Sequence, residues 1–388
     1  MSWEYIRLGD VCTKIGSGAT PKGGATAYID EGTSFIRSQN IYNLEFSHEG
    51  LVHITEDAAK KLNGVAVQKD DVLINITGDS VARTCMVPDA VLPARVNQHV
   101  AIVRPDSNRL NPRFLNYYLT SPYMQSLMLG LAVGKGASRN AMTKDMIANF
   151  DILCPPIEIQ ESIVGILSTY DALIENNQRQ IKLLEEAAQR LYKEWFVNFR
   201  FPGYEDTPIV DGVPEGWADG TLGDIAVFKR GKTITKAQVS DGNIPVVAGG
   251  LEPAYYHNKA NTTAPLITVS ASGANAGFTR LYNIDVFASD CSYIDSNSTP
   301  FLLFVYCFLK TNAMKLNSLQ KGSAQPHVYA KDLNALVLSV PSEGVLTAFC
   351  GIVSPYFERI RLLQRENEIA AQARDRLLPK LMSGEIEA

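Results

Sequence analysis

Residues 159–197 read IQESIVGILSTYDALIENNQRQIKLLEEAAQRLYKEWFV, and this stretch decides the fold. Mostly apolar residues recur along it at alternating steps of four and three. They are Ile163, Leu167, Tyr170, Ile174, Asn177, Ile181, Leu184, Ala188, Leu191 and Trp195. A mean step of 3.5 residues is the coiled-coil period, whereas a helix lying on a globular core repeats every 3.6. One helix over these 39 residues is about 58 Å long.

The same stripe returns near the end of the chain. It comprises Phe349, Val353, Tyr356, Ile360, Leu363, Asn367, Ala370, Arg374, Leu377 and Leu381. We expect each stripe to form a single helix. Asn177, Asn367 and Arg374 interrupt the apolar pattern, and two interpretations of them stay open. They mark places where the stripe is hydrated, or they fix the register and partner of the helices.

The rest of the chain is duplicated as well. Trp3 precedes Leu8-Gly9-Asp10 by five residues, and Trp217 precedes Leu222-Gly223-Asp224 by the same step. Pro155 and Pro341 stand before the two long stretches. The span from Trp217 to Pro341 is 28 residues shorter than the span from Trp3 to Pro155, while the edges of both copies are preserved. This pattern indicates two homologous domains with different interiors.

Connectivity predicts how the two helices pair. The second domain begins near the end of the first helix, and the second helix begins where that domain ends. If the helices touch, a compact second domain makes them antiparallel, and they form a rod of about 50–60 Å. An intermolecular coiled coil is the competing interpretation, but the equal length and phase of the stripes favour pairing within one chain.

The expected fold class is α+β, with two homologous mixed α/β domains separated by two long helices that form an antiparallel coiled coil. The expected domains are 1–155 and 200–341, with spacer helices at 156–199 and 342–383 and a tail at 384–388. Short β-branched runs predict strands at 72–77, 99–104, 148–153, 266–269 and 335–340. Stretches with proline near their first turn predict helices at 111–128 and 300–315.

Composition excludes several classes of protein. The 388 residues include 36 basic and 41 acidic side chains, so the net charge of −5 argues against a basic nucleic-acid coat protein or a polycationic membrane binder. The longest apolar run, 301–309, is too short to cross a bilayer, and the N-terminus does not resemble a signal peptide. Six scattered cysteines and five dispersed histidines predict a reduced, cytoplasmic chain without a metal site.

Catalytic motifs are not found in the sequence. Asn111-Pro112-Arg113-Phe114 has arginine where an amino-methyltransferase motif has its second proline, and it is typical of a helix start. Gly134-Lys135-Gly136 does not complete the spacing of a phosphate-binding loop. No serine-hydrolase or zinc-protease motif occurs. The sequence therefore disfavours ATP binding, while a nuclease site stays open because the carboxylate motifs of nucleases are degenerate.

Polar clusters on glycine-bearing loops are the candidate site. Arg and Lys pair with guanine, Asn and Gln with adenine, and Ser or Thr with either base. The candidate DNA contacts of the first domain are Arg37, Gln39, Asn40, Asp79, Ser80, Arg83, Asn97, Gln98, His99, Lys135, Ser138, Arg139 and Asn140. Those of the second domain are Lys229, Arg230, Lys232, Ser270, Ser272, Asn275, Lys321, Gln325 and His327. For any single residue an ordinary polar turn is the simpler interpretation, whereas the clusters taken together favour DNA.

The order of these parts resembles the specificity subunits of type I restriction–modification systems over essentially the whole chain. The resemblance rests on the Trp-x4-Leu-Gly-Asp start, Asn97-Gln98-His99, the lysine–glycine loop, Pro155-Pro156 and the long helix, after which the order repeats. Residues 191–203 resemble the central linker of that family, and 377–385 resemble its tail. The second copy departs in two places. Ser342 replaces the second proline, and Ala288-Ser289-Asp290 lies near the place of Asn-Gln-His.

The resemblance implies a non-catalytic subunit that reads an asymmetric DNA target in two parts, with one domain for each half-site. The rod spans on the order of 15 base pairs at about 3.4 Å each. The implied partners are double-stranded DNA, two methyltransferase subunits and restriction or translocase subunits. S-adenosylmethionine, ATP and Mg²⁺ are then bound by those partners. The candidate spacer and subunit-contact residues are Tyr170, Ile174, Ile181, Leu184, Leu191, Trp195, Tyr356, Ile360, Leu363, Leu377 and Leu381.

Two other functions compete with this interpretation. A coiled-coil adaptor whose two domains bind protein or another ligand has less reason to differ between its domains, and the 28-residue difference disfavours it. An adenine methyltransferase acting alone is disfavoured by Arg113 and by the missing glycine-rich cofactor loop.

Overall fold

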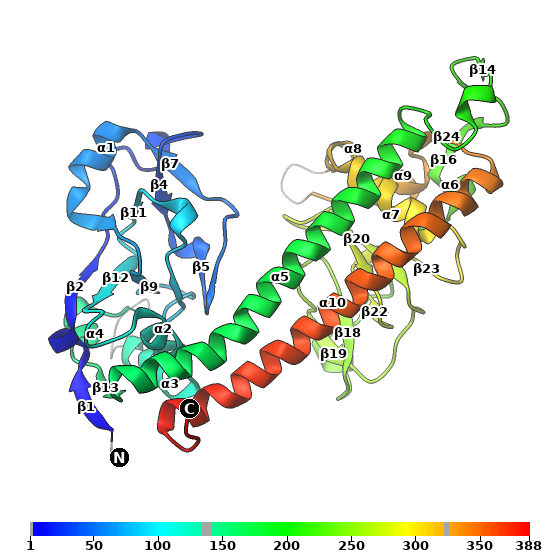
Figure 1. The fold of residues 1–388 in the computed structure, drawn as a ribbon. Helices are drawn as coiled ribbons and strands as arrows, with labels where there is room; N and C mark the ends of the chain where they lie inside the picture. Colours follow the sequence, from blue (N-terminus) through cyan, green and yellow to red (C-terminus); the bar gives the residue numbers. More distant parts are fainter. Residues whose placement is uncertain (1–2, 134–140, 322–325) are drawn as a thin grey trace. The chain divides into compact units, whose positions relative to one another are not determined.

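The computed structural model describes residues 3–133, 141–321 and 326–388. The chain divides into two units (Figure 1). Unit 1 comprises Met1–Ile174 and Asn367–Ala388, and unit 2 comprises Glu175–Glu366. The long helices α5 (Ile157–Phe196) and α10 (Glu343–Ser383) each contribute one part to unit 1 and the other part to unit 2.

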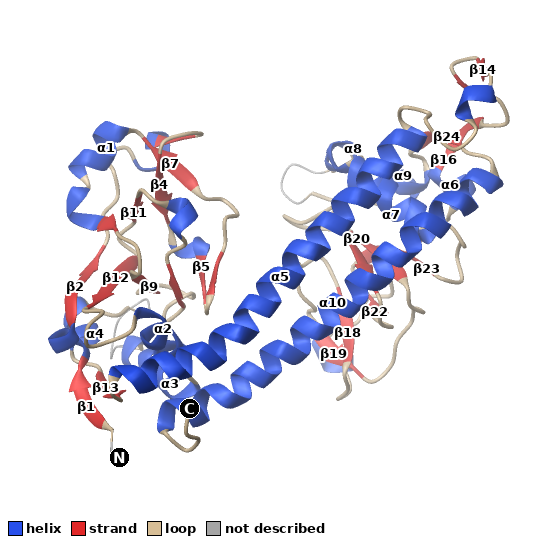
Figure 2. Ribbon diagram, in the orientation of Figure 1, coloured by secondary structure: helices blue, strands red, loops and turns tan. Residues whose placement is uncertain are grey.

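In its described residues, unit 1 combines short strands with short helices besides its parts of α5 and α10 (Figure 2). The helices are α1 (Glu56–Lys61), α2 (Pro112–Thr120), α3 (Pro122–Ala132) and α4 (Lys144–Ala148). The strands are β1 (Glu4–Arg7), β2 (Cys12–Ser17), β3 (Tyr28–Ile29), β4 (Thr33–Ile36), β5 (Ile41–Tyr42), β6 (Glu45–Phe46), β7 (Val52–Ile54), β8 (Ala66–Val67), β9 (Val72–Asn75), β10 (Thr84–Met86), β11 (Ala94–Val96), β12 (Val100–Pro105) and β13 (Asp151–Cys154).

Unit 2 has the same mixture of elements. Its helices are α6 (Leu222–Ile225), α7 (Leu302–Thr311), α8 (Ala313–Ser318) and α9 (Ala330–Asn334). Its strands are β14 (Ile209–Val210), β15 (Val213–Pro214), β16 (Ala218–Thr221), β17 (Lys229–Arg230), β18 (Ile244–Val247), β19 (Tyr255–His257), β20 (Leu266–Ser270), β21 (Thr279–Tyr282), β22 (Phe287–Ala288), β23 (Cys291–Asp295) and β24 (Val337–Val340).

The sheets confirm the duplication. Each unit has an antiparallel four-stranded sheet, in the order β10-β9-β12-β2 in unit 1 and β21-β20-β23-β17 in unit 2. Each unit also has a second sheet around one parallel pair, β4 with β11 or β18 with β22. Finally, the first and last strands of each domain pair, β1 with β13 and β16 with β24. The mixed α/β fold class is therefore confirmed for both domains.

Most of the 28-residue difference falls in one segment. Asn75 and Ser270 occupy the same place in the two four-stranded sheets, and their side chains bond the carbonyls of Ser38 and Gly249 respectively. The segment from Gly249 to Ser270 is 16 residues shorter than the segment from Ser38 to Asn75. The longer segment of unit 1 contains the β5–β6 hairpin and the strands β7 and β8, whereas the segment of unit 2 contributes β19 to its second sheet. That sheet has five strands in unit 1 and three in unit 2, and β3, which lies before the longer segment, is the fifth strand of unit 1.

The central strands of unit 1 are buried on both faces. Val72 and Ile74 on β9 pack in a cluster with α2, α5 and α10, while Leu73 on the opposite face packs against the β4–β11 sheet. Alternate residues of a strand point to opposite faces, so both faces need apolar side chains. Each buried branched side chain contributes about 1.5–3 kcal/mol to stability.

The two long helices pair antiparallel inside each unit. In unit 2, Trp195 near the end of α5 contacts Phe349 near the start of α10, with ring centroids 5.8 Å apart, while Asn177 donates to Glu366 at 2.9 Å. In unit 1, Leu167 of α5 shares a core with Leu378 of α10. The prediction of antiparallel pairing within one chain is confirmed.

Two expected helices are each divided in the structure. The helix expected at 111–128 breaks between α2 and α3, because Pro122 disfavours the helical conformation at Ser121, whose ψ is 148°. The helix expected at 300–315 breaks at Asn312, between α7 and α8. Asn111 caps α2 by accepting from the backbone of Arg113 and Phe114, which confirms that this motif is a helix start.

Among the described residues, no helix is long and apolar enough to span a membrane.

Candidate nucleic-acid interface

One loop has the same backbone in both units. Loop A (77–83) joins β9 to β10 in unit 1, and loop B (272–278) joins β20 to β21 in unit 2. In loop A, Ala82 donates to Asn75 O at 2.9 Å and Arg83 to Ser80 O at 3.2 Å. Loop B repeats these bonds from Gly277 to Ser270 O at 2.9 Å and from Phe278 to Asn275 O at 2.9 Å.

The two loops also share their unusual backbone angles. Gly78 and Gly273, at the same position, have φ of 77° and 81°. Ala82 and Gly277, at another, have φ of 73° and 90°. Glycine adopts this left-handed region without steric cost, and alanine at 82 is held there by the hydrogen bonds on either side. The backbone is thus common to both units, and the exposed side chains on it differ.

His99, just before β12, and Asp290, just before β23, bond to the chain where each loop begins. Ile76 N donates to His99 O at 2.9 Å, and in unit 2 Ala271 N donates to Asp290 O at 3.2 Å. Asp290 therefore stands where His99 stands. The hydroxyl of Thr77 bonds His99 Nδ1 at 2.6 Å, and the hydroxyl of Ser272 donates to Asp290.

The same register shows that unit 2 has one residue fewer than unit 1 just before this strand. The amide N–H groups of Asn97 and Ser289 donate to Ile36 O and Val247 O, which are equivalent carbonyls of β4 and β18. Ser289-Asp290 thus stands for Asn97-Gln98-His99, and Gln98 has no counterpart in unit 2. This explains why the Asn-Gln-His motif does not recur in the sequence.

Both ring nitrogens of His99 have neighbours. Gln98 Nε2 lies 3.1 Å from His99 Nε2, and the Thr77 hydroxyl lies 2.6 Å from Nδ1. The imidazole is therefore held by polar contacts on both sides.

Several predicted residues meet around one pocket of unit 1, of about 580 Å³. Its lining includes Gln39, Asp79, Ser80, Arg83 and His99 from the predicted set. It also includes Ser38, Tyr42, Thr77, Gly78 and Ala141. We call this the Arg83 pocket. Its lining offers both donors and acceptors, which is the chemistry that base edges require.

Arg83 is the cation of this pocket. Its guanidinium lies 4.7 Å from the centroid of the Tyr42 ring, a cation–π distance. Tyr42 is held nearby because the turn after β5 bonds to β10. Thr84 N donates to Asn43 Oδ1 at 3.1 Å, and Leu44 N donates to Thr84 O at 3.0 Å. Among the described residues, Arg83 has no carboxylate partner.

Some predicted DNA contacts support loops instead. Asn40 has no exposed surface, and its amide donates to Ser47 O and Glu49 O. Asn97 is buried, and its Oδ1 accepts from His99 N. Ser270 is buried and bonded to Gly249 O. These three side chains are buried and engaged within their own unit in this structure, and direct base contact by them stays a prediction.

Arg37 is also engaged within unit 1. Its Nη2 donates to Gly50 O at 2.6 Å and its guanidinium lies 5.3 Å from the Tyr28 ring centroid. Gln39 shares the Gly50 carbonyl through a longer contact of 3.4 Å and remains exposed.

In unit 2 the predicted basic residues fall into two sets. Lys229 and Lys232 are exposed, and Arg230 lies 3.6 Å from Asp290. Lys321 forms an ion pair with Asp332 at 2.7 Å, and His327 bridges to Ser272 through the backbone. Asn275 on loop B lines a separate pocket of about 480 Å³ together with Phe278.

Five predicted contacts, Lys135, Ser138, Arg139, Asn140 and Gln325, lie outside the described residues. Two pocket-side residues were missed by the sequence analysis. Tyr42 and Phe278 are aromatic and exposed, and neither belongs to a polar cluster of the kind that was sought.

The predicted spacer residues pack inside the units. Trp195, Ile360, Leu363 and Leu381 are buried, and the others of that set are half-buried. The apolar residues of the long helices that remain exposed lie beside the stripe. Leu183, Leu362 and Ile369 are examples.

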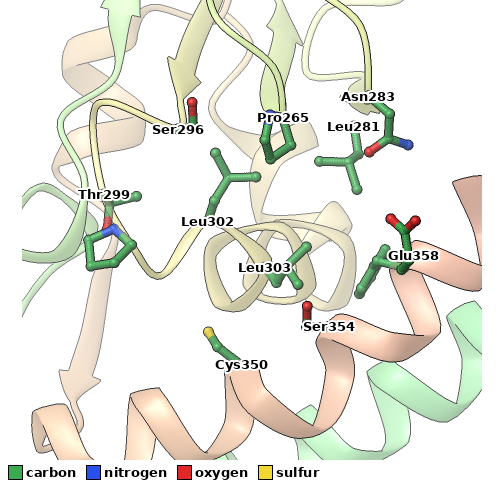
Figure 3. A pocket seen from close by; sticks show the side chains of 12 residues that line it. Pro265, Leu281, Asn283, Ser296, Thr299, Leu302, Leu303, Cys350, Ser354 and Glu358 are labelled. Atoms are coloured by element: carbon green, nitrogen blue, oxygen red, sulfur yellow. The ribbon is translucent and has the colours of Figure 1, made fainter.

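A further pocket of about 330 Å³ lies within unit 2, between α7 and α10 (Figure 3). Leu302 and Leu303 of α7 and Cys350, Ser354 and Glu358 of α10 contribute to its lining. It contains none of the predicted DNA contacts. Within the described residues, no group of three or more His, Cys, Asp or Glu side chains could hold a metal ion.

Several known proteins are similar to this chain over most of its length. A family model described as "Type I restriction modification DNA specificity domain" matches residues 1–186 and 214–369. The chain is 25% identical over 413 residues to the type I restriction enzyme MjaIX specificity subunit of Methanocaldococcus jannaschii, covering 99% of this chain and 93% of that protein. It is 22% identical to the HindI specificity subunit of Haemophilus influenzae, covering 99% of each. Among solved structures, the type I restriction–modification S subunit from M. genitalium matches with a TM-score of 0.56 at 16% identity, covering 98% and 96% of the two chains.

Proposed function

The chain belongs to the family of type I restriction–modification specificity subunits, and on that premise we propose that it reads a DNA target in two parts, one half-site for each unit. It performs no chemistry itself, as is the rule for these subunits. The alternative of a protein-binding adaptor is not favoured.

One observation carries the proposal of two half-sites. Loops A and B share their hydrogen bonds and φ angles, while Asp79, Ser80 and Arg83 on one correspond to Ala274, Asn275 and Phe278 on the other. A common backbone with different exposed side chains is what two readers of different sequences require. A symmetric adaptor has no need of this difference.

Partner subunits would supply the chemistry. We expect two methyltransferase subunits to bind the long helices, with S-adenosylmethionine there, and restriction subunits to carry ATP and Mg²⁺. The exposed apolar residues beside the stripe, such as Leu362 and Ile369, are candidate contacts. The spacer helices would fix the gap between half-sites at on the order of 15 base pairs. We place the assembly in the cytoplasm, where its DNA is.

The test is adenine-methylation mapping of genomic DNA from cells that carry the partner methyltransferase gene with or without the gene for this chain. The expected result is a split motif that requires this gene. If an active methyltransferase produces the same methylation pattern in both strains, the proposal is wrong and the adaptor function becomes the better explanation.

A further inference from the structure

We propose that loops A and B are the specificity-determining segments, and that Arg83 reads a guanine in one half-site while Asn275 reads an adenine in the other. This inference rests on the proposed function and adds the residue and the base class at each site.

The first step of the argument is the matched register. The backbone bonds that shape loop A within the described residues recur in loop B, so position 80 corresponds to 275 and position 83 to 278. The buried residues around the loops also agree in kind, since Thr84 and Thr279 are both buried. Differences between the loops are thus concentrated in side chains that project from an unchanged backbone.

The second step concerns Arg83. Its guanidinium is fixed over the Tyr42 ring and stands in a pocket with polar walls. A planar guanidinium with free N–H groups matches the paired acceptors O6 and N7 of guanine. The aromatic ring limits the rotamers of the arginine before DNA arrives, so less conformational freedom is lost on binding.

The third step explains why unit 2 cannot read a base in the same way. The segment that carries Tyr42 is the one that is 16 residues shorter there, and Phe278 takes the place of Arg83. At the position of Ser80, loop B has instead the half-buried polar side chain of Asn275. Asn275 lines the pocket of about 480 Å³, and no hydrogen bond engages its amide within the described residues, which leaves its donor and acceptor for the N7 and N6 of adenine.

The fourth step assigns His99 and Asp290 a positioning role. Each shares one side-chain hydrogen bond with the loop hydroxyl of Thr77 or Ser272, and each accepts a backbone hydrogen bond from Ile76 or Ala271, the residue just before its loop. They support the two loops by different chemistry and do not need to contact DNA.

The experiment uses the full chain with its methyltransferase partner and maps the methylated motif for Arg83→Ala and Asn275→Ala. We expect Arg83→Ala to relax one guanine position by on the order of 10-fold or more, and Asn275→Ala to relax one adenine position in the opposite half-site. Matched controls are Arg113→Ala in unit 1 and Asn258→Ala in unit 2, which are exposed but lie outside both loops. Both controls should keep the parental motif.

The outcomes separate the two proposals. If the parental chain specifies no motif, both proposals fail. If the parental motif is split but neither loop variant changes it, only the loop assignment is overturned. Arg83→Lys guards against a folding defect, because it keeps the charge and the stem but loses the fork that pairs with guanine. It should therefore also relax the guanine position, and retention of full discrimination would overturn the assignment.

Discussion

Arg374 of α10 donates a 2.7 Å hydrogen bond to Asp171 of α5 within unit 1. The hydroxyl of Tyr117 on α2 donates to the same carboxylate, and burial together with this bond raises the pKa of Tyr117 well above its usual range. At the equivalent positions of the duplicated helices, unit 2 has Phe357 in place of Asp171 and Ala188 in place of Arg374. The contact between α5 and α10 at this place is therefore a charged hydrogen-bond network in unit 1, whereas apolar side chains occupy the equivalent positions in unit 2.

Asp171→Ala should lower the free energy of unfolding by roughly 1–2 kcal/mol, because the Arg374 guanidinium loses one of its carboxylates. The cost is discounted because the Asp171 side chain is 32% exposed and Arg374 keeps Asp375 at 2.9 Å. Urea unfolding measures the change. The double replacement Asp171→Phe with Arg374→Ala copies unit 2, where Phe357 packs edge to face on Tyr306, and it should recover most of the loss. Equal stability of the single variant and the parent would show that the network is unimportant.

Gly18→Ala should destabilise the protein by about 2 kcal/mol or more, because a Cβ there overlaps the carbonyl oxygens of Val96 and Asn97. Gly231→Ala in unit 2 should do the same against Ala288 and Ser289. Gly16→Ala is the matched control, since a Cβ at that position meets nothing within 4 Å. Thermal unfolding compares the three, and the prediction fails if Gly18→Ala is as stable as Gly16→Ala.

The double variant Lys229→Ala with Lys232→Ala should weaken DNA binding by a similar factor for every DNA sequence. If each exposed lysine neutralises one phosphate, the slope of log K against log salt becomes less negative by about 1.8. Titrations of a fixed duplex at several salt concentrations give the slope. Lys60→Ala with Lys61→Ala on α1 is the charge-matched control, and a slope that changes equally in both pairs would assign the effect to net charge alone.

Cys85 and Cys291 should resist thiol reagents at pH 8. Burial raises the pKa of each thiol to about 12, so the reactive thiolate is scarce until the pH approaches that value. Labelling followed by mass spectrometry should find both modified only after denaturation. Rapid labelling of either residue in the folded protein would contradict the burial described for it.

The long helices were predictable because their signal is strong and local. The stripe positions of both helices are buried or half-buried as the 3.5-residue period requires. The periodicity argument did not account for Pro355, which lies inside α10 and removes one helical hydrogen bond. Packing of Val353 and Phe357 on either side of it in the unit 2 core maintains the helix.

The sequence predicted which loops form the candidate site, but not which residues of the two units correspond. Short polar clusters identified Asp79, Ser80 and Arg83, and the structure brings them together around one pocket. The pairing of Ser80 with Asn275 could not be found from the sequence, because the offset between the copies changes several times along the domain and only backbone bonds define the register. Sequence polarity alone also could not show that the Asn40 amide bonds its own loop.

Unit 1 is discontinuous in the chain. Residues 367–388 complete it, and Leu378, Leu381 and Met382 fill part of its core beside Leu167. Trp3 lies against Gly384, so the two ends of the described chain meet there. During synthesis the first unit emerges from the ribosome early, yet it cannot bury this core until residues 367–388 follow. Unit 2, which is continuous, can close before that. A chain interrupted before residue 367 would thus display an open apolar surface in unit 1, which is the surface that chaperones and proteases recognise.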